Sequence, residues 1–316
     1  MKLLIGIAAA LALPAPALAV DKEPPPRVHE LTTFAAPGCA GACGSGSTIG
    51  PDRALYVTDG PGGRVLRIDP RTGAMRTFAH GLPPQAPDIG LGGAIDVEFV
   101  GRRAYVLVTL AGVSGVYRVE RDGSATVVAD LGAWSIAHPP ATDFFVPGGV
   151  QYALERYRGD LLVSDGHHNR VLRVSRTGEI RELMAFGNVV PTGLDVYGRS
   201  IYVAQAGPIP HRPGDGKVVR LGRRAITLAS GASLLVDVEW NRWRLYALSQ
   251  GRWDLPPTPE NEGKPATPGT GRIVRFDGRR LVPVVSRLDR PTSFELVGNS
   301  AYVVTLTGKV IRVDHL

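Results

Sequence analysis

The chain is poor in the features that stabilise small secreted domains or anchor proteins in membranes. Only two cysteines occur in 316 residues, Cys39 and Cys43, so disulfides cannot hold together a core of this size. We expect these two to bond to each other and stiffen a short loop, because two ligands are too few for a zinc site. After the first twenty residues, no apolar run is long enough for a transmembrane helix.

Long amphipathic helical patterns are also missing, which argues against an all-α fold. We find no serine nucleophile elbow, no HExxH and no phosphate-binding glycine loop. The net charge of +7 is modest, and basic segments interleaved with aromatics are absent, so nucleic acid is not an expected partner.

The N-terminus has the pattern of a secretory signal peptide. Lys2 precedes an apolar stretch, Leu3–Leu13, and Ala17-Leu18-Ala19 provides small residues for cleavage. We therefore predict a signal peptide over residues 1–19, followed by a single domain over residues 20–316. The expected location is periplasmic or extracellular, and the absence of a cysteine just after the cut argues against a lipid anchor.

Short β-rich segments separated by turns fill the rest of the chain and repeat six times. Each repeat contains two alternating strands in succession. The first of the pair reads ALYVTD (54–59), AYVLVT (104–109), LLVSDG (161–166), IYVAQA (201–206), LYALSQ (245–250) and AYVVTL (301–306). The second reads VLRID (65–69), VYRVE (116–120), VLRVS (171–175), VVRLG (218–222), IVRFD (273–277) and VIRVD (310–314).

Further strands flank most of these pairs, so each repeat has four, at a spacing of about forty to fifty residues. This pattern predicts an all-β fold, a six-bladed β-propeller with four-stranded blades. The sixth repeat ends after three strands. The alternating segment within residues 27–35 is predicted to supply its missing strand and so close the ring.

The connections of such a blade divide between two faces. The short turns carry many arginines, which predicts a basic face that could meet an anionic surface, although an ordinary solvated surface is the alternative. The other face holds long loops, 80–93, 132–149, 206–217 and 251–271. Because long loops on a rigid scaffold often carry function, we place the ligand site there, above the central channel.

Polar residues near the channel are the first candidates for that site. The first strands of five repeats offer Asp96, Gln151, Asp195, Asp237 and Glu295. Carboxylates gathered at a narrow channel repel one another and need raised pKa values or a bound cation, so Asp195, Asp237 and Asp96 are candidate ligands for calcium or magnesium. The alternative is that these side chains accept backbone hydrogen bonds between blades.

The remaining candidates are histidines and tryptophans of the loop face. His167 and His168 follow Asp165 and could bind a metal or act as an acid or base, although a polar turn is the simpler interpretation. The long loops add His211, Trp134 and Trp253 as candidate ligand contacts.

The segments LLVSDGHHNRVLRV (161–174) and PTGLDVYGRSIYVAQA (191–206) resemble the NHL-like class of six-bladed propellers. Together with ALYVTDGPGGRVLRID (54–69) and LVDVEW (235–240), they make the chain similar to the ScyD/ScyE family of exported bacterial proteins. That resemblance implies a role in the bacterial envelope and no assigned reaction.

Two related propeller classes imply other activities. Gluconolactonase and senescence-marker propellers hold a divalent metal with asparagine among the ligands, but here Thr192 and Gly148 stand at the corresponding places. Quinone-dependent sugar dehydrogenases share the frame, and their catalytic residues have no match.

The sequence therefore predicts a monomeric binding or scaffold module, without a required cofactor, whose partner is a small molecule or an envelope polymer or protein. A metal-dependent hydrolase of the lactonase or esterase type, or a quinone-dependent sugar dehydrogenase, is the alternative.

Overall fold

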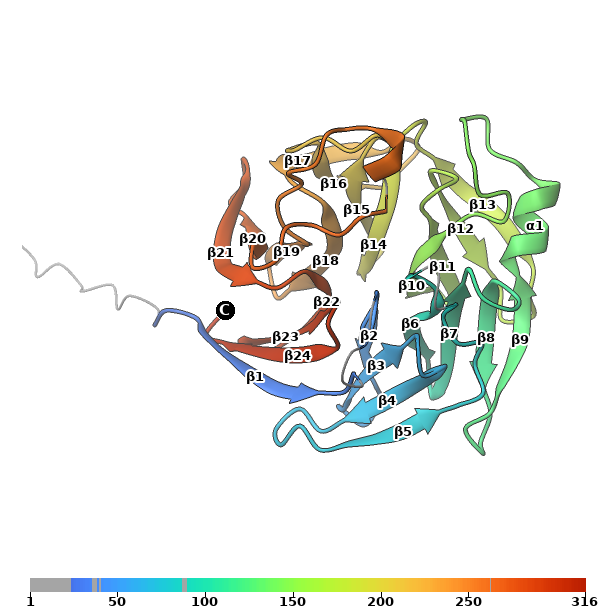
Figure 1. Cartoon of the computed structure of the whole chain (residues 1–316), viewed down its shortest axis with the longest axis horizontal. Coiled ribbons are helices and arrows are strands. Elements are labelled where there is room, and N and C mark those ends of the chain that lie inside the picture. The colour runs from blue at the N-terminus through green and yellow to red at the C-terminus, as the bar shows by residue number, and fades with distance from the viewer. Residues whose placement is uncertain (1–23, 36–38, 40, 87–89, 262) are drawn as a thin grey trace, which may run out of the picture.

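Six four-stranded antiparallel sheets are arranged as blades around a central axis (Figure 1). This architecture is that of a computed structural model, which describes residues 24–35, 39, 41–86, 90–261 and 263–316. The predicted all-β, six-bladed propeller is confirmed. The predicted signal peptide lies outside the described residues.

The blades follow one another along the chain, each running from an inner to an outer strand. Blade one contains β2 (Ser47–Ile49), β3 (Leu55–Asp59), β4 (Arg64–Ile68) and β5 (Met75–Ala79). Blade two contains β6 (Gly93–Val100), β7 (Arg103–Thr109), β8 (Gly115–Val119) and β9 (Ala125–Asp130). Blade three contains β10 (Gln151–Tyr157), β11 (Asp160–Asp165), β12 (Arg170–Val174) and β13 (Ile180–Ala185).

The second half of the ring repeats this order. Blade four contains β14 (Val190–Tyr197), β15 (Ser200–Gly207), β16 (Gly216–Arg220) and β17 (Ile226–Ala232). Blade five contains β18 (Leu235–Asn241), β19 (Arg244–Ser249), β20 (Gly271–Phe276) and β21 (Leu281–Leu288). Blade six contains β22 (Pro291–Val297), β23 (Ser300–Thr305) and β24 (Lys309–Asp314).

The fourth strand of blade six comes from the other end of the described chain. β1 (Arg27–Thr33) pairs antiparallel with β24, with Arg27 opposite Asp314 and Thr33 opposite Lys309. Lys309 Nζ also lies 2.7 Å from Glu30 Oε2. This confirms that the N-terminal strand closes the ring and covers the edge of β24 that would otherwise be unpaired.

The hydrophobic core lies between neighbouring blades, because the apolar side chains of the alternating strands point into the space between one sheet and the next. Between blades one and two, Tyr56 meets the rings of Phe78 and Phe99 edge to face, with centroids 4.7 and 4.8 Å apart. Between blades two and three, Leu107, Leu161 and their neighbours are fully buried. Each such side chain contributes about 1.5–3 kcal/mol on burial, which accounts for the preference of the second and third strands for valine and leucine.

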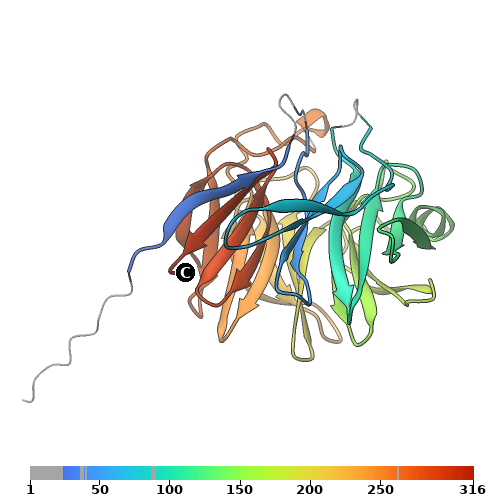
Figure 2. The same cartoon turned by 90° about the horizontal axis from the view of Figure 1, so that it is seen from below.

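The two faces of the disc differ as the loop lengths predict. In the side view of Figure 2 the long connectors lie at the top and the tight hairpin turns at the bottom. The long connectors include a short helix, α1 (Leu131–Ala137), and a single 3-10 turn, η1 (Pro259–Asn261). Neither of these helices, the only two in the described ranges, is long and apolar enough to cross a membrane.

Candidate functional site

A ring of carboxyl groups surrounds the axis, one from the inner strand of each of five blades. Each of these residues pairs directly with a residue of the second strand of its blade. That partner is a tyrosine in four of the five blades. The members are Glu98, Glu155, Asp195, Glu239 and Glu295, and Thr48 takes the equivalent place in blade one. Since all stand three residues before the first-to-second-strand turn, the ring lies near the face of the tight turns.

The ring lines a cavity of about 730 Å³ that follows the axis. Residues of both faces border it, such as Gly298 from a tight turn and His211 from a long loop. Two further carboxyl groups, Asp96 and Asp237, line it two residues deeper along their strands, and Arg156 is the single arginine among the described lining residues. Seven acidic groups therefore face one guanidinium in a shared space.

Burial raises the pKa of every one of these seven carboxyl groups. The pKa of Asp195 rises to about 6 and that of Asp237 to about 7, in both cases mainly through loss of hydration. Loss of hydration also raises the pKa of the other five, and repulsion from neighbouring carboxylates adds to the rise for most of them: Asp96, Glu98, Glu155, Glu239 and Glu295. The site therefore holds protons near neutral pH that ordinary carboxyl groups would have released.

The deeper aspartates bind the blades together. Asp96 accepts hydrogen bonds from Val97 N at 2.8 Å and, across the blade boundary, from Leu154 N at 2.7 Å. Asp237 repeats the arrangement with its own strand and with Phe294 N of the next blade, at 2.9 and 3.0 Å. Both aspartates thus use each carboxylate oxygen to hold backbone, as the structural alternative for these residues predicts.

Glycine makes room for these aspartates in the preceding blade. A Cβ added to Gly46 would collide with Asp96, and one added to Gly193 would collide with the backbone of Asp237. The same glycine and aspartate pair therefore occurs at blades one and two and again at blades four and five.

The ring members differ in how firmly they are held. Glu98 accepts from Phe99 N at 2.6 Å, from Thr48 Oγ1 at 3.2 Å and from the Arg156 guanidinium at 3.0 Å. Asp195 accepts from Trp240 N of the next blade at 2.7 Å. In the part of the chain that the structure describes, no donor hydrogen-bonds to the carboxyl groups of a third set, Glu155, Glu239 and Glu295. These three are available to a ligand.

The predicted calcium or magnesium ligands do not fit a metal site. All three aspartates already accept hydrogen bonds from backbone: Asp96 and Asp237 with both oxygens, and Asp195 from Trp240 N and Val196 N. Within residues 24–316, apart from the gaps named above, no three histidine, cysteine or acidic side chains are arranged to hold a metal ion.

A second buried network surrounds Asp165 at the end of β11. Arg170 Nε lies 2.9 Å from Asp165 Oδ2, while its other nitrogens donate to Ser135 Oγ at 3.1 Å and to His138 O at 2.8 Å. The Arg170 guanidinium also covers the Trp134 ring, 4.9 Å from its centroid. Every charge in this network has an opposite or polar partner.

His168 and Gln151 belong to the same network and not to the axial cavity. His168 Nε2 lies 3.0 Å from Val146 O and its Nδ1 lies 3.0 Å from an Arg170 nitrogen, so Nε2 carries the proton and Nδ1 accepts. Gln151 donates to Asp165 Oδ1 at 3.1 Å and accepts from Thr109 Oγ1 at 2.9 Å. Both side chains are therefore used in hydrogen bonds within the protein.

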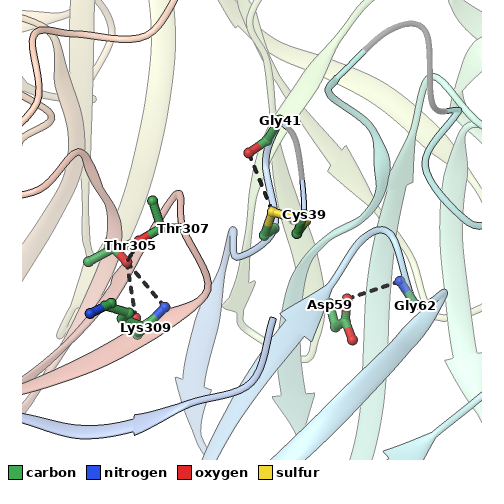
Figure 3. Close-up of a disulfide and its surroundings, with 8 residues drawn as sticks. Cys39, Gly41, Asp59, Gly62, Thr305, Thr307 and Lys309 are labelled. Atoms are coloured by element: carbon green, nitrogen blue, oxygen red, sulfur yellow. Dashed lines mark hydrogen bonds between the residues drawn. A yellow bond between two sulfur atoms is a disulfide. The ribbon is translucent and has the colours of Figure 1, made fainter. Parts of the chain in front are cut away.

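Blade one contains a more open version of the same pair. Arg64 Nε lies 2.7 Å from Asp59 Oδ2. Asp59 Oδ1 also accepts a hydrogen bond from Gly62 N at 2.9 Å, which Figure 3 shows. The segments TDGPGGR and SDGHHNR thus place an aspartate at the end of the second strand and an arginine at the start of the third. The ion pair fixes the hairpin that joins them.

The other predicted contacts lie at three different places. His211 lines the axial cavity, whereas Trp253 is buried behind it in an apolar cluster and meets His211 at a centroid distance of 5.9 Å. Trp134 lies on α1 at the outside of the ring (Figure 1). His167 borders a smaller cavity with Phe145, and burial lowers the pKa of His167 to about 4.

The predicted disulfide forms between Cys39 and Cys43. Cys43 N donates to Leu306 O at 2.9 Å and Ala42 N donates to Gly90 O at 2.9 Å, so the loop joins blade six to the start of blade two. Gly41 and Ala42 border the axial cavity, and the bridge therefore stiffens part of its rim.

The fold and the axial cavity define the class, a six-bladed β-propeller. Solved structures agree along nearly the whole chain: a gluconolactonase from Xanthomonas campestris (13% identity, 95% of this chain and 97% of that one, TM-score 0.61), a virginiamycin B lyase from Staphylococcus aureus (13%, 92% and 99%, 0.58) and a PQQ-bound aldose sugar dehydrogenase from Streptomyces coelicolor (12%, 92% and 98%, 0.58). At these identities the likeness shows the fold alone. No protein-family model and no curated protein sequence matches the chain.

Proposed function

We propose that this propeller is a binding module that takes a small basic molecule, with amine or guanidinium groups, into the axial cavity. The observation that carries the proposal is the ring of carboxyl groups, of which Glu155, Glu239 and Glu295 face about 730 Å³ of space without hydrogen-bond donors from the described residues. A cation that bridges them would relieve their mutual repulsion and supply the missing donors.

The size and shape of the cavity favour an organic cation over a bare metal ion. A volume of this order is typical of small-molecule sites, and the carboxyl groups are spread around a ring instead of converging on one point. A ligand with two cationic ends could contact groups on opposite blades, for example Glu155 and Glu295. Binding and not turnover is the proposed role, because the deeper aspartates are committed to backbone.

The resemblance to ScyD/ScyE proteins supports an exported protein of the bacterial envelope, periplasmic or extracellular, and the disulfide is compatible with an oxidising compartment. The signal peptide over residues 1–19 remains part of this proposal.

An enzyme is the second candidate, because the similar structures include a lyase, a lactonase and a dehydrogenase. The specific observation in its favour is the raised pKa of Asp195, about 6, because a carboxyl group that titrates near neutral pH suits acid–base catalysis. Hydrolysis of a sugar lactone by the purified protein, lost in the variant Asp195→Asn, would support this alternative.

The experiment is calorimetric titration with a short diamine, putrescine, and with the guanidinium compound agmatine. We expect binding that releases protons, since the ligand drives deprotonation of carboxyl groups whose pKa values are raised. The heat should therefore depend on the ionisation enthalpy of the buffer, and the affinity should increase between pH 6 and pH 8.

The double variant Glu239→Gln, Glu295→Gln should weaken binding at least tenfold. The matched control is Glu179→Gln, an exposed carboxyl group in a turn of blade three, which should leave the affinity unchanged. Equal affinity for the neutral analogue butanol, or no loss in the double variant, would contradict the proposal.

A further inference from the structure

The face of the tight turns is dominated by exposed arginines, and their distribution is uneven. Blades four and five carry seven of them, on the turns β14–β15, β16–β17, β18–β19 and β20–β21: Arg199, Arg223, Arg224, Arg242, Arg244, Arg279 and Arg280. Asp277 is the one acidic residue in these turns. We call this surface the basic sector.

Blades one to three also have arginines on the same face, and most of their turns contain acidic residues as well, although the β6–β7 turn with Arg102 and Arg103 has none. Arg53 and Arg71 of blade one are accompanied by Asp52 and Asp69, and Arg121 of blade two by Asp122. Several of these acids also accept hydrogen bonds within their own turns. The excess of positive charge is therefore concentrated on one side of the disc.

The most exposed large apolar side chain of the described chain stands inside the basic sector. Trp243, at the tip of the β18–β19 turn, is 85% exposed and is flanked by Arg242 and Arg244. Tyr197 at the end of β14 and Val297 at the end of β22 are exposed by 39% and 44%. Exposed apolar side chains that lie together and are rimmed by polar residues are typical of protein–protein or membrane interaction sites.

The turns that carry these side chains are fixed to one another across three blades. Tyr197 Oη donates to Arg242 O at 3.4 Å, and Arg242 donates to Asn299 Oδ1 at 3.4 Å. Asn241 donates to Gly298 O at 2.6 Å. Tyr197 also stacks on Trp240, with ring centroids 5.2 Å apart. Trp243 is thus presented outward from a rigid support.

We propose that the basic sector docks this protein on an anionic lipid bilayer, with Trp243 inserted at the interface and the arginines on the head groups. Tryptophan has a known preference for the membrane–water interface, and basic residues are attracted by anionic lipid. An acidic polymer would be bound by the arginines alone and would leave Trp243 in water. This docking is independent of the axial site and leaves the long-loop mouth of the cavity facing away from the membrane.

The test is co-sedimentation of the purified protein with vesicles of phosphatidylcholine alone and with 30% phosphatidylglycerol. We expect binding to the anionic vesicles that weakens at high salt, together with a blue shift of tryptophan emission. Arg242→Glu with Arg244→Glu should lower the partition coefficient at least twentyfold, since each basic residue near the surface contributes a factor of about five. Trp243→Ser should lower it roughly tenfold.

Two further variants separate docking from misfolding and from net charge. Arg223→Glu with Arg224→Glu changes the outer part of the basic sector and should give a comparable loss. Arg102→Glu with Arg121→Glu makes the same charge change on blade two, across the ring, and should have at most a twofold effect. Equal losses in these two variants would overturn the proposal, as would binding to polyaspartate as strong as to vesicles and indifferent to Trp243.

Discussion

Two clusters of buried charge lie within one propeller and follow opposite rules. Around Asp165, in the hairpin of blade three, the arginine, the histidine and the hydroxyl groups satisfy one another. Around the axis, seven carboxyl groups share a cavity with Arg156 as the only arginine among its described lining residues. The paired cluster stabilises the fold, whereas the like-charged cluster is held in place by the fold. The difference is the reason why we propose the axis, and not the histidine-containing turn, as the ligand site.

Breaking the paired cluster should have the largest effect. Arg170→Met removes the guanidinium and leaves the Asp165 carboxylate buried without its cation, which costs about 3–5 kcal/mol. Urea unfolding followed by circular dichroism measures the loss. The double variant Arg170→Met, Asp165→Leu should recover part of it, and a single variant as stable as the parent would show that the pair contributes nothing.

The axial cluster should reveal itself through pH. Burial raises the pKa values of its carboxyl groups, so the folded protein keeps protons that the unfolded chain releases above about pH 4.5. The free energy of unfolding should therefore fall between pH 5 and pH 7, by up to about 1.4 kcal/mol per pH unit for each such group. His167, whose pKa is lowered to about 4, acts in the opposite direction but involves one proton.

Glu239→Gln sharpens this second prediction, because it removes one titrating group and keeps the side-chain shape. The slope of unfolding free energy against pH should become shallower in the variant. If the free energy of unfolding of the parent protein instead rises steadily from pH 5 to pH 7, these carboxyl groups are ionised in the folded state and a bound cation neutralises their charge.

The smallest effect is expected at the blade-one copy of the pair. Arg64 is 39% exposed on its side chain and Asp59 has other backbone support, so Arg64→Met should cost about 1 kcal/mol or less. Thermal unfolding of the Arg64→Met and Arg170→Met variants, measured side by side, shows how much more the same aspartate–arginine pair stabilises the protein when it is buried.

The fold was predictable because alternation and turn chemistry recur six times, and even the closing strand followed from them. The ring at the axis was predicted only in part. Aligning the first strands from their beginnings groups Asp96 and Asp237 with Asp195 and Glu295, but these inner strands contain register shifts, for example between Ala94 and Asp96.

Counting back three residues from each tight turn instead finds the ring, including Glu98, Glu155 and Glu239, which the strand-based alignment misses. That signal was present in the sequence. The sequence did not show that Asp96 and Asp237 hold neighbouring blades together while the ring carboxyl groups line the cavity. The hydrogen bonds from Leu154 N to Asp96 and from Phe294 N to Asp237 depend on how the blades twist against each other.

The pairing of β1 with β24 has a consequence for the order of folding. Five blades are continuous in sequence and can each form without any later part of the chain, but the sixth needs residues 27–33 and 309–314 together. The early segment must therefore wait, unpaired, through the synthesis of nearly the entire polypeptide. A chaperone that shields this segment during that interval would protect the nascent chain from intermolecular strand exchange.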